Sequence, residues 1–367
     1  MIEVSAELGA VLNAGGFTHY YEADVIVDGE VVLTGLRLNA CQLDGDADRQ
    51  VLTQGAATVV YSDELGRSVA PEDFSSWFNP YTTYLSLSLV VAAGGGFVEK
   101  VLRGVVKVVA VSDPREHFVS VNDTLLTVGS SIRVRLADAF HVTQAEDFAS
   151  PSAPSDLSST WAEIQRITAL GVVRNVADAE IPRSVAYQKS RLDAVFNLGT
   201  LLGGRPVVSR DGLVAILPDE WGDPVGRLQI GADGLVQAVA PAEWSDAGIF
   251  NEVVVRSHDD AQQTVLAVAR VEGGPLRYGG PFGRRPFIYS SELITTEGDA
   301  QNFANAELPR VSSQPAQDYA IQCAPDPRLE VGDVIEFQDT RGAELTGRIV
   351  SQTLPGPGLM SLTVQRG

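Results

Sequence analysis

Cysteine and histidine are scarce in this sequence of 367 residues, and their positions exclude common kinds of stabilising and catalytic site. Cys41 and Cys323 are far apart and form no CxxC pair, so neither a disulfide framework nor a cysteine-based zinc site is supported. We expect both to be buried thiols, since free cysteine usually behaves as a small hydrophobic residue. No HxH or HExxH spacing places two imidazoles on one metal. The four isolated histidines are His19, His117, His141 and His258.

Long hydrophobic segments are also absent. The longest apolar run, 84–98, is interrupted by serines and three consecutive glycines, and it falls short of the ~20 residues that span a bilayer. The first seven residues carry two acids and no base, whereas a secretory signal begins with a cationic segment. We therefore expect a soluble protein that is made in a cytoplasm and has no membrane segment.

Basic residues are outnumbered throughout the chain. The 27 Lys and Arg stand against 47 Asp and Glu, which gives a net charge of −20. The excess of acids is spread over both parts of the chain, with 9 − 20 = −11 for residues 1–149 and 18 − 27 = −9 for the rest. Because affinity for DNA comes largely from cations that neutralise phosphates, a general nucleic-acid binder is excluded.

Most of the sequence is typical of short β-strands, so we predict a mainly β fold with a smaller α+β insertion. Asp28-Gly29 and Asp211-Gly212 each separate apolar runs and predict hairpins, because the central residues of tight turns need positive φ. Further strands are expected over 57–61, 85–91, 98–111, 132–136, 251–256, 265–271, 333–338, 348–352 and 360–365.

Helical patterns are few. Thr160 and Glu163 match a capping box, which predicts a helix that ends at Gly171. A second helix is expected over 190–202 and a third over 297–308. We thus expect the helices to be concentrated between about 157 and 205, plus one near 300.

The segment 149–159 is the best candidate for a linker. Its residues 150–158 contain four serines and two prolines and have little apolar surface to pack. We expect it to be exposed and to be the first site of limited proteolysis, whereas cleavage within 105–111 would count against this boundary.

A scan for catalytic motifs finds none, so we predict no enzymatic activity, catalytic residue or cofactor. There is no GxSxG elbow and no Walker A lysine, and the Gly94–Gly96 run lacks the third glycine and the helix of a dinucleotide loop. No pair of acids has a spacing that selects it as a glycosidase pair.

One acidic cluster resembles the start of a calcium loop. Asp44, Asp46 and Asp48 alternate along the chain, but Arg49 occupies the position that needs glycine, and Gly55 the position that needs a bidentate glutamate. We favour a solvated loop and predict no metal site, while binding of a cation by the three aspartates stays open.

The one local basic feature is Arg284-Arg285, within an aromatic- and glycine-rich stretch. Phe282 and Phe287 flank the two arginines, and the prolines and glycines make a poor strand or helix. Because arginine and aromatic residues are enriched at interface cores, we interpret these four residues as a possible partner-contact loop. An ordinary exposed loop is the equal alternative.

Four stretches of the second half carry a family resemblance by their order. They are RLDAVF with GGRP and DG within 191–218, FNEVVVR at 250–256, SELITT and the following alanines within 291–308, and PRLEVGDVI with the strands after it within 327–364. Together they resemble tail-tip or baseplate hub proteins of long-tailed bacteriophages, particularly minor tail proteins of phages that infect actinobacteria. The resemblance covers about residues 185–367.

The resemblance implies a structural virion protein with two tube-like β-barrel domains and an outer α+β domain. The expected division is an N-terminal tube-like domain over 1–148, the linker 149–159, the outer domain over 160–245, and a second tube-like domain over 246–367. Such hubs are homotrimers that form a pseudo-hexameric ring, which continues the tail tube around the DNA-ejection channel. Their neighbours are the distal tail or tube ring, the tape measure, and the central spike or receptor-binding proteins. The location implied is the virion tail tip, after synthesis in the bacterial host cytoplasm.

Two other classes stay open. A soluble carbohydrate-binding module would also be acidic and rich in strands, but no aromatic platform is identifiable among Trp77, Trp161, Trp221 and Trp244. A cell-wall-degrading tail-associated enzyme would need a motif that the sequence lacks. Stoichiometry distinguishes them, since a hub forms a closed ring. For a hub we also expect an acidic or neutral lumen and no specific nucleic-acid binding.

Overall fold

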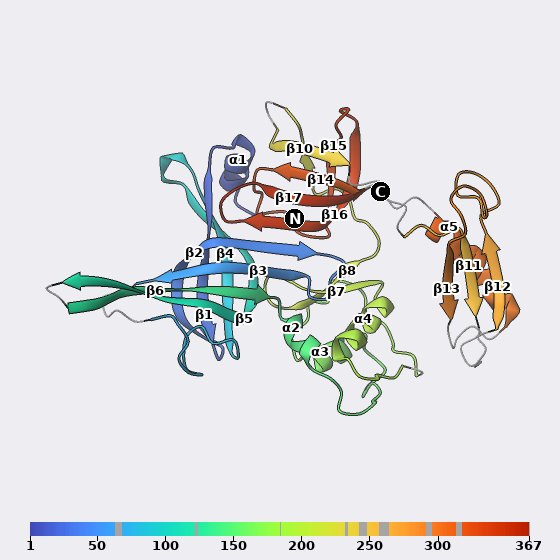
Figure 1. Ribbon diagram of the computed structural model, residues 1–367, viewed down its shortest axis with the longest axis horizontal. Coiled ribbons are helices and arrows are strands. Elements are labelled where there is room, and N and C mark those ends of the chain that lie inside the picture. Colours follow the sequence, from blue (N-terminus) through green and yellow to red (C-terminus); the bar gives the residue numbers. More distant parts are fainter. Residues whose placement is uncertain are drawn as a thin grey trace. The chain divides into compact units, whose positions relative to one another are not determined.

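A computed structural model describes residues 1–62, 68–121, 124–183, 185–231, 234–241, 248–256, 264–290, 296–312 and 318–366. The chain divides into two compact units (Figure 1). The large unit comprises Met1–Ala240 and Tyr319–Gly367, and the small unit comprises Pro241–Asp318. Strands account for 47% of the chain and helices for 16%, which confirms the predicted mainly β class.

Six strands of the large unit form a closed antiparallel circuit, called here the first circuit. In order of pairing they are β1 (Thr18–Val27), β4 (Thr83–Ala92), β5 (Val98–Val121), β6 (Thr124–Ala137), β3 (Thr53–Tyr61) and β2 (Glu30–Asp46). The circuit closes because β2 also pairs with β1. The predicted hairpin at Asp28-Gly29 joins these two strands, with φ of 51° at Asp28 and 85° at Gly29.

Alternating burial explains why these segments form strands around one core. In β4, Leu85, Leu87 and Leu89 are fully buried, and Ser86 and Ser88 alternate with them. An apolar residue at every second position gives each strand one inward face. β5 is longer than the predicted strand 98–111, and it continues with β6 as a two-stranded ribbon beyond the rest of the circuit (Figure 1).

A second path of six strands in the large unit is called here the second circuit. It runs β9 (Gly226–Leu228), β15 (Val334–Gln338), β16 (Glu344–Pro355), β17 (Met360–Arg366), β14 (Asp318–Cys323) and β10 (Val236–Pro241). A parallel bridge between Ile230 and Val236 connects the segment after β9 to β10, so the two ends of the path meet.

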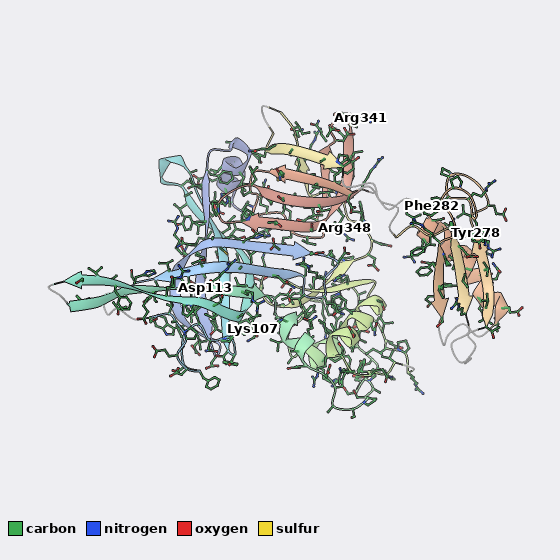
Figure 2. The ribbon with its side chains drawn as sticks, viewed as in Figure 1. Lys107, Asp113, Tyr278, Phe282, Arg341 and Arg348 are labelled. Atoms are coloured by element: carbon green, nitrogen blue, oxygen red, sulfur yellow. The ribbon has the colours of Figure 1, made fainter. Side chains whose placement is uncertain are left out.

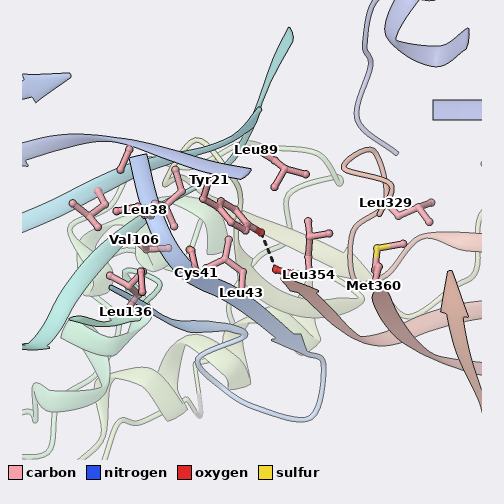
Figure 3. Close-up of a cluster of buried hydrophobic side chains, with 14 of the residues drawn as sticks. Tyr21, Leu38, Cys41, Leu43, Leu89, Val106, Leu136, Leu329, Leu354 and Met360 are labelled. Carbon is pink, nitrogen blue, oxygen red and sulfur yellow. Dashed lines mark hydrogen bonds between the residues drawn. The ribbon is translucent and has the colours of Figure 1, made fainter. Parts of the chain in front are cut away.

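The two circuits are continuous with one another. β16 pairs antiparallel with β2 over Ser351–Pro355 and Gln42–Asp46, and one cluster of buried side chains runs through both circuits. Within it, the Tyr21 hydroxyl donates to the Leu354 carbonyl at 3.0 Å (Figure 3). Both circuits therefore belong to one packed body.

The remaining part of the large unit is a small α+β layer. Its elements are α2 (Phe140–Ala145), α3 (Thr160–Thr168), α4 (Arg191–Leu201) and the hairpin of β7 (Gly204–Val208) with β8 (Val214–Pro218). Its own hydrophobic core is centred on Trp161, which is fully buried. The predicted hairpin at Asp211-Gly212 is confirmed, with φ of 77° at Gly212.

The two predicted helices of this layer are present, but the expected capping box is wrong. The α3 cap is Ser159, whose Oγ accepts the N–H of Ala162 at 3.1 Å. Glu163 is instead buried, and its carboxylate accepts from the Arg166 guanidinium and the Tyr187 hydroxyl. A partner on the same helix and a tertiary partner thus take the carboxylate that a capping box would use. The helix ends at Ala169, two residues before Gly171, in a left-handed conformation with φ of 56°.

The segment 149–159 lies against the α+β layer at two points. Ser152 and Tyr187 exchange backbone hydrogen bonds of 3.0 and 2.7 Å, and the Leu157 carbonyl accepts from Ile181 N–H at 2.8 Å. Several side chains of the segment are exposed, including Pro151 and Ser155.

The small unit is a three-stranded sheet covered by one helix. β11 (Glu252–Arg256) lies between antiparallel β12 (Val265–Arg270) and parallel β13 (Pro286–Ser290). α5 (Glu297–Ser312) buries Ala300 and Ala304 against this sheet. The helix begins where the sequence predicts and extends beyond 308.

Two further helices were not predicted, and they lie outside 157–205 and the region near 300, where the sequence concentrates its helical patterns. α1 (Ala6–Ala14) is capped by Ser5 and buries Leu8 and Leu12, and α2 follows β6 directly. Both helices are short, and α2 has no side-chain cap, so their sequences carry few of the residues by which a helix is recognised. No helix among the described residues is long and apolar enough to cross a membrane.

Candidate partner-binding surfaces

The predicted contact loop lies in the small unit, between β12 and β13, and its arginines stack on aromatic rings. The Arg285 guanidinium carbon lies 4.5 Å from the centre of the Phe282 ring, and that of Arg284 lies 5.5 Å from the centre of the Tyr278 ring. Arg270 stacks on Tyr278 at 4.4 Å. Such cation–π contacts hold planar guanidinium groups in fixed orientations.

The four predicted residues do not form a single exposed surface. Arg284 is exposed, whereas Phe282 and Arg285 are half-buried. Phe287 packs edge-to-face on Phe250 at 5.5 Å and contributes to the core of the small unit. Phe287 is therefore a core residue of β13. The ring on which Arg284 stacks belongs to Tyr278, a contact that the sequence did not predict.

The Asn251 side chain binds the backbone of the loop between β12 and β13. Its side chain is fully buried, and its Nδ2 donates to the carbonyls of Leu276 and Gly283, both at 3.0 Å. Its Oδ1 accepts the N–H of Arg285 at 2.8 Å. One amide side chain thus satisfies three backbone groups of the loop, which explains how a segment rich in glycine keeps one conformation.

Replacing Asn251 with alanine is expected to loosen this loop. Each buried backbone group left without a partner costs about 1–3 kcal/mol, so we expect amide exchange at Arg285 to accelerate at least about tenfold. Hydrogen exchange followed by mass spectrometry measures this. The matched control is Gln301→Ala, because Gln301 is exposed and contacts only β12 and its own helix. Equal exchange in the two variants would contradict the role of Asn251.

A second exposed aromatic feature lies between β3 and β4. Phe74 and Tyr81 are 75% and 65% exposed, and their ring centres are 5.0 Å apart. Buried Asn79 holds the turn, since its side chain donates to the Phe74 and Ser76 carbonyls and accepts from the N–H of Tyr81. The pair is thus presented on a fixed loop. The sequence search for a platform considered only tryptophan and missed it.

Two arginines bind carbonyl groups of segments that are distant in sequence, and one of them, Arg103 of β5, reaches from the first circuit to the second. The Arg103 guanidinium donates to the carbonyls of Pro327 and Leu329 and to the Gln352 side chain. From β16, the Arg348 guanidinium donates to the carbonyls of residues 218, 219, 220 and 332 (Figure 2). These bonds join segments that are distant in sequence, so they fix the second circuit and the chain that leads into it.

A cavity of about 420 Å³ in the large unit is lined by residues of the first circuit, the second circuit and the α+β layer. Asp138 is 2% exposed at its wall, and its carboxylate accepts backbone N–H groups of Thr53 and Phe140. Burial raises the pKa of Asp138 to about 6, although these hydrogen bonds lower it. Asp138 thus binds the start of β3 and the start of α2, and burial of its ionised carboxylate opposes folding.

Asp138 is expected to make stability depend on pH. Because its pKa is higher in the folded chain than the ordinary 3.8, its contribution is fully present below about pH 4 and is lost as the pH rises through 6. The loss is about 3 kcal/mol, from about 2 units at about 1.4 kcal/mol each. Denaturant unfolding across this range should therefore show a steeper decline for the native chain than for Asp138→Asn, which cannot ionise. Parallel declines would contradict the assignment.

The residues scanned for chemistry are used structurally. The Asp46 carboxylate accepts from Asp48 N–H and pairs with Arg49, and Asp44 accepts from the Thr353 hydroxyl. Within the described residues, no group of three or more acids, histidines or cysteines has the arrangement of a metal site. Both cysteines are buried, and burial raises the pKa of each thiol to about 12. His258 lies outside the described residues.

The fold is similar to that of known phage tail proteins. The 43 kDa tail protein of prophage MuSo2 from Shewanella oneidensis superposes with a TM-score of 0.56 at 14% identity, over 94% of this chain and 98% of that chain. Prophage tail protein gp18 from Listeria monocytogenes gives 0.46 at 11% identity over 94% of each chain, and a phage P2 baseplate chain gives 0.40 at 12% identity over 95% and 99%. No protein-family profile and no curated protein matches the sequence. The MuSo2 likeness shows that this chain has the fold of a phage tail protein.

Proposed function

We propose that this chain is a structural virion protein, the hub of a phage tail tip, and acts without catalysis. The observation that carries the proposal is the pair of six-stranded circuits, joined by β2 and β16, in a chain that shares its fold with the MuSo2 tail protein. In this proposal each circuit is a tube-like β-barrel domain. Three copies would then place six such domains around one axis and form a pseudo-hexameric ring.

The proposed ring continues the tail tube and surrounds the channel through which DNA leaves. The shared core cluster and the Arg103 contacts support it, because both connect the two circuits that would form the tube wall. Its neighbours would be the distal tail or tube ring, the tape measure and the central spike or receptor-binding proteins. The resemblance of 185–367 to minor tail proteins of actinobacterial phages supports the hub role over other places in the tail.

Charge supports a channel that releases DNA. Three copies carry −60 (3 × −20), and each cation on the wall would add a phosphate contact that favours retention. Electrostatic repulsion acts over only about 8 Å at physiological salt, so it does not oppose contacts between copies that exclude water.

Oligomeric state and DNA affinity together test the proposal. Native mass spectrometry of the concentrated chain, or of the chain with its tail neighbours, should give a closed trimer. Duplex DNA at about 0.15 M salt should show no measurable binding. Open-ended polymers, or tight salt-sensitive DNA binding, would contradict the hub.

The outer domain of the hub is proposed to be 160–245, which includes α3, α4 and the β7–β8 hairpin, with 149–159 as the linker that precedes it. Limited proteolysis tests this division, and we expect the first cut within 149–159, at its exposed residues. The control region is 105–111, which lies in β5 between its neighbouring strands. A first cut there, with 149–159 intact, would place the boundary elsewhere.

The Phe74–Tyr81 pair favours a second candidate, a carbohydrate-binding module. Paired exposed rings suit stacking on a sugar, and the hollow beside them is lined by Glu72, Asp73 and Ser75. Retention on purified cell-wall polysaccharide that is lost in Phe74→Ala/Tyr81→Ala would support the module. Equal lack of retention in both proteins would leave the hub as the better account.

A further inference from the structure

The β5–β6 ribbon extends well beyond the first circuit, and no third strand among the described residues pairs with its outer part. The pairing of β5 with β4 stops at Lys107, and the pairing of β6 with β3 stops at Ser130, whereas β5 and β6 pair with one another up to Val121 and Thr124. This ribbon, over 112–121 and 124–129, is called here the arm. Figure 1 shows it projecting from the circuit, and Figure 2 labels Asp113 near its base.

The outer part of the arm is apolar, exposed and without charged residues in its described strands. Phe118, Val119, Leu126 and Val128 are 55%, 46%, 49% and 42% exposed. Natural edge strands are usually protected by charges or proline, but here Pro114, Arg115 and Glu116 lie only at the base, and 117–121 and 124–129 carry no acid, lysine or arginine. A two-stranded ribbon alone is marginally stable in water, so the arm needs a partner.

The opposite side of the same circuit offers a matching surface. In the order of pairing, β5 stands three strands from β2 and β6 stands three strands from β1, so the β1–β2 hairpin lies across the circuit from the arm. Just after its turn, Val31 and Val32 are 56% and 39% exposed. β2 pairs with β3 only from Leu38 onward, so its preceding segment has an edge that β3 does not cover.

The arm side and the β1–β2 hairpin carry opposite charges. Arg133 and Arg135 of β6 are exposed, and their cross-strand neighbours on β3 and β5 are Thr, Ala and Ser. The turn of the β1–β2 hairpin exposes Asp28 and Glu30. The apolar residues of the arm thus continue toward two arginines, and the exposed valines of the β1–β2 hairpin lie next to two acids.

We propose that the arm of each copy docks on the β1–β2 hairpin of a second copy of this chain. The two surfaces differ and lie on opposite sides of the circuit, so the contact is head-to-tail and closes into a ring when the rotation fits. The arm would cover the edge of β2 before Leu38, in the manner of an added strand, and its apolar residues would contact Val31 and Val32. This inference rests on the proposed ring and adds the surfaces that build it.

Engineered disulfides test the contact, since both native thiols are buried. Chains carrying Phe118→Cys and Val31→Cys together should cross-link into a covalent closed ring at least about tenfold faster than a control, a ratio that corresponds to about 1.4 kcal/mol. The control carries Phe118→Cys and Val98→Cys, because Val98 is exposed to the same degree as Val31 (59% against 56%). Dilute chains are tested with their tail neighbours, so that assembly is not limiting.

Other outcomes separate this inference from the proposed function. A trimer seen by native mass spectrometry, with cross-linking no faster than in the control, would overturn the arm contact and leave the hub standing. Rapid Phe118–Val31 cross-linking into open polymers would support the contact and overturn the closed ring. Dimers from Phe118→Cys alone would indicate arms that face each other, which contradicts head-to-tail docking.

A charge exchange gives an independent measurement. Arg133→Glu with Arg135→Glu should weaken assembly by about a hundredfold, because like charges are then brought together across the contact. Adding Asp28→Arg and Glu30→Arg in the same chain should restore most of the loss. Failure of this rescue, with circular dichroism unchanged, would overturn the proposed pairing of surfaces.

Discussion

Replacing Trp161 with alanine is expected to lower the free energy of unfolding of the α+β layer by about 3–5 kcal/mol. The indole is fully buried between α3 and its neighbours, and its Nε1 donates to the Val176 carbonyl at 3.2 Å. The substitution removes the largest buried side chain of that core and leaves a cavity that backbone elements on several sides cannot fill. Denaturant unfolding followed by far-ultraviolet circular dichroism measures the change.

Hydrogen exchange shows which elements lose stability in Trp161→Ala. We expect protection to fall in α3, α4 and the β7–β8 hairpin, while β4 of the first circuit keeps its protection, because the two regions have separate core clusters. Trp161→Phe is the control, since it keeps a ring and should cost about 1–2 kcal/mol. Uniform loss of protection across the large unit would contradict a separately packed α+β layer.

Replacing Arg103 with alanine is expected to lower the stability of the large unit by about 2–4 kcal/mol. The guanidinium donates to the Pro327 and Leu329 carbonyls and to the Gln352 side chain, so its removal takes a donor from each of three partly buried acceptors. The Leu329 carbonyl keeps its bond from Gln352 Nε2. Denaturant unfolding measures the loss. We also expect faster exchange in β16, whose Gln352 loses a partner.

Two variants control for the Arg103 result. Arg103→Lys keeps the charge without the planar fork and should recover less than half of the loss. Arg37→Ala removes an exposed guanidinium that lies 4.2 Å from the Tyr20 ring, and it should cost less than about 1 kcal/mol. If Arg103→Ala were no more destabilising than Arg37→Ala, the arginine contacts would not hold the circuits together.

Local features of the fold were predictable because their signals lie within a few residues. Asp28-Gly29 needs positive φ at both central residues, and the structure shows a hairpin there. The helix that follows Ser190 is capped by the Ser190 side chain, which accepts the N–H of Asp193. Such signals depend on side chains next to the backbone that they organise.

The circuits could not be predicted, because their pairings join distant segments. β2 pairs with β16 across about three hundred residues, and no local pattern records such a partner. Glu163 shows the same limit on a smaller scale, since Arg166 and Tyr187 take the carboxylate that a capping box would use. Alternating burial identifies a strand and its inward face, but not the neighbour it selects.

The candidate surfaces were predictable only in part. The richness of 278–287 in arginine and aromatic rings led to the interpretation of a partner-contact loop, but Phe287 faces the core because β13 alternates from Pro286. The arm was missed because the strand prediction stopped at 111, where Ser112, Asp113 and Pro114 suggest a turn. Asp113 instead adopts a φ of 52° at a shift in register, and the strand continues.

Electron cryo-microscopy of the assembled particle tests the central claim most directly. The account predicts a threefold ring of this chain on the tail axis, with six strand circuits around a channel whose wall is acidic or neutral. The same map would show whether each arm lies against the β1–β2 hairpin of the next copy. A chain found off the axis, a ring of another symmetry, or a channel lined mainly by arginines would contradict the account.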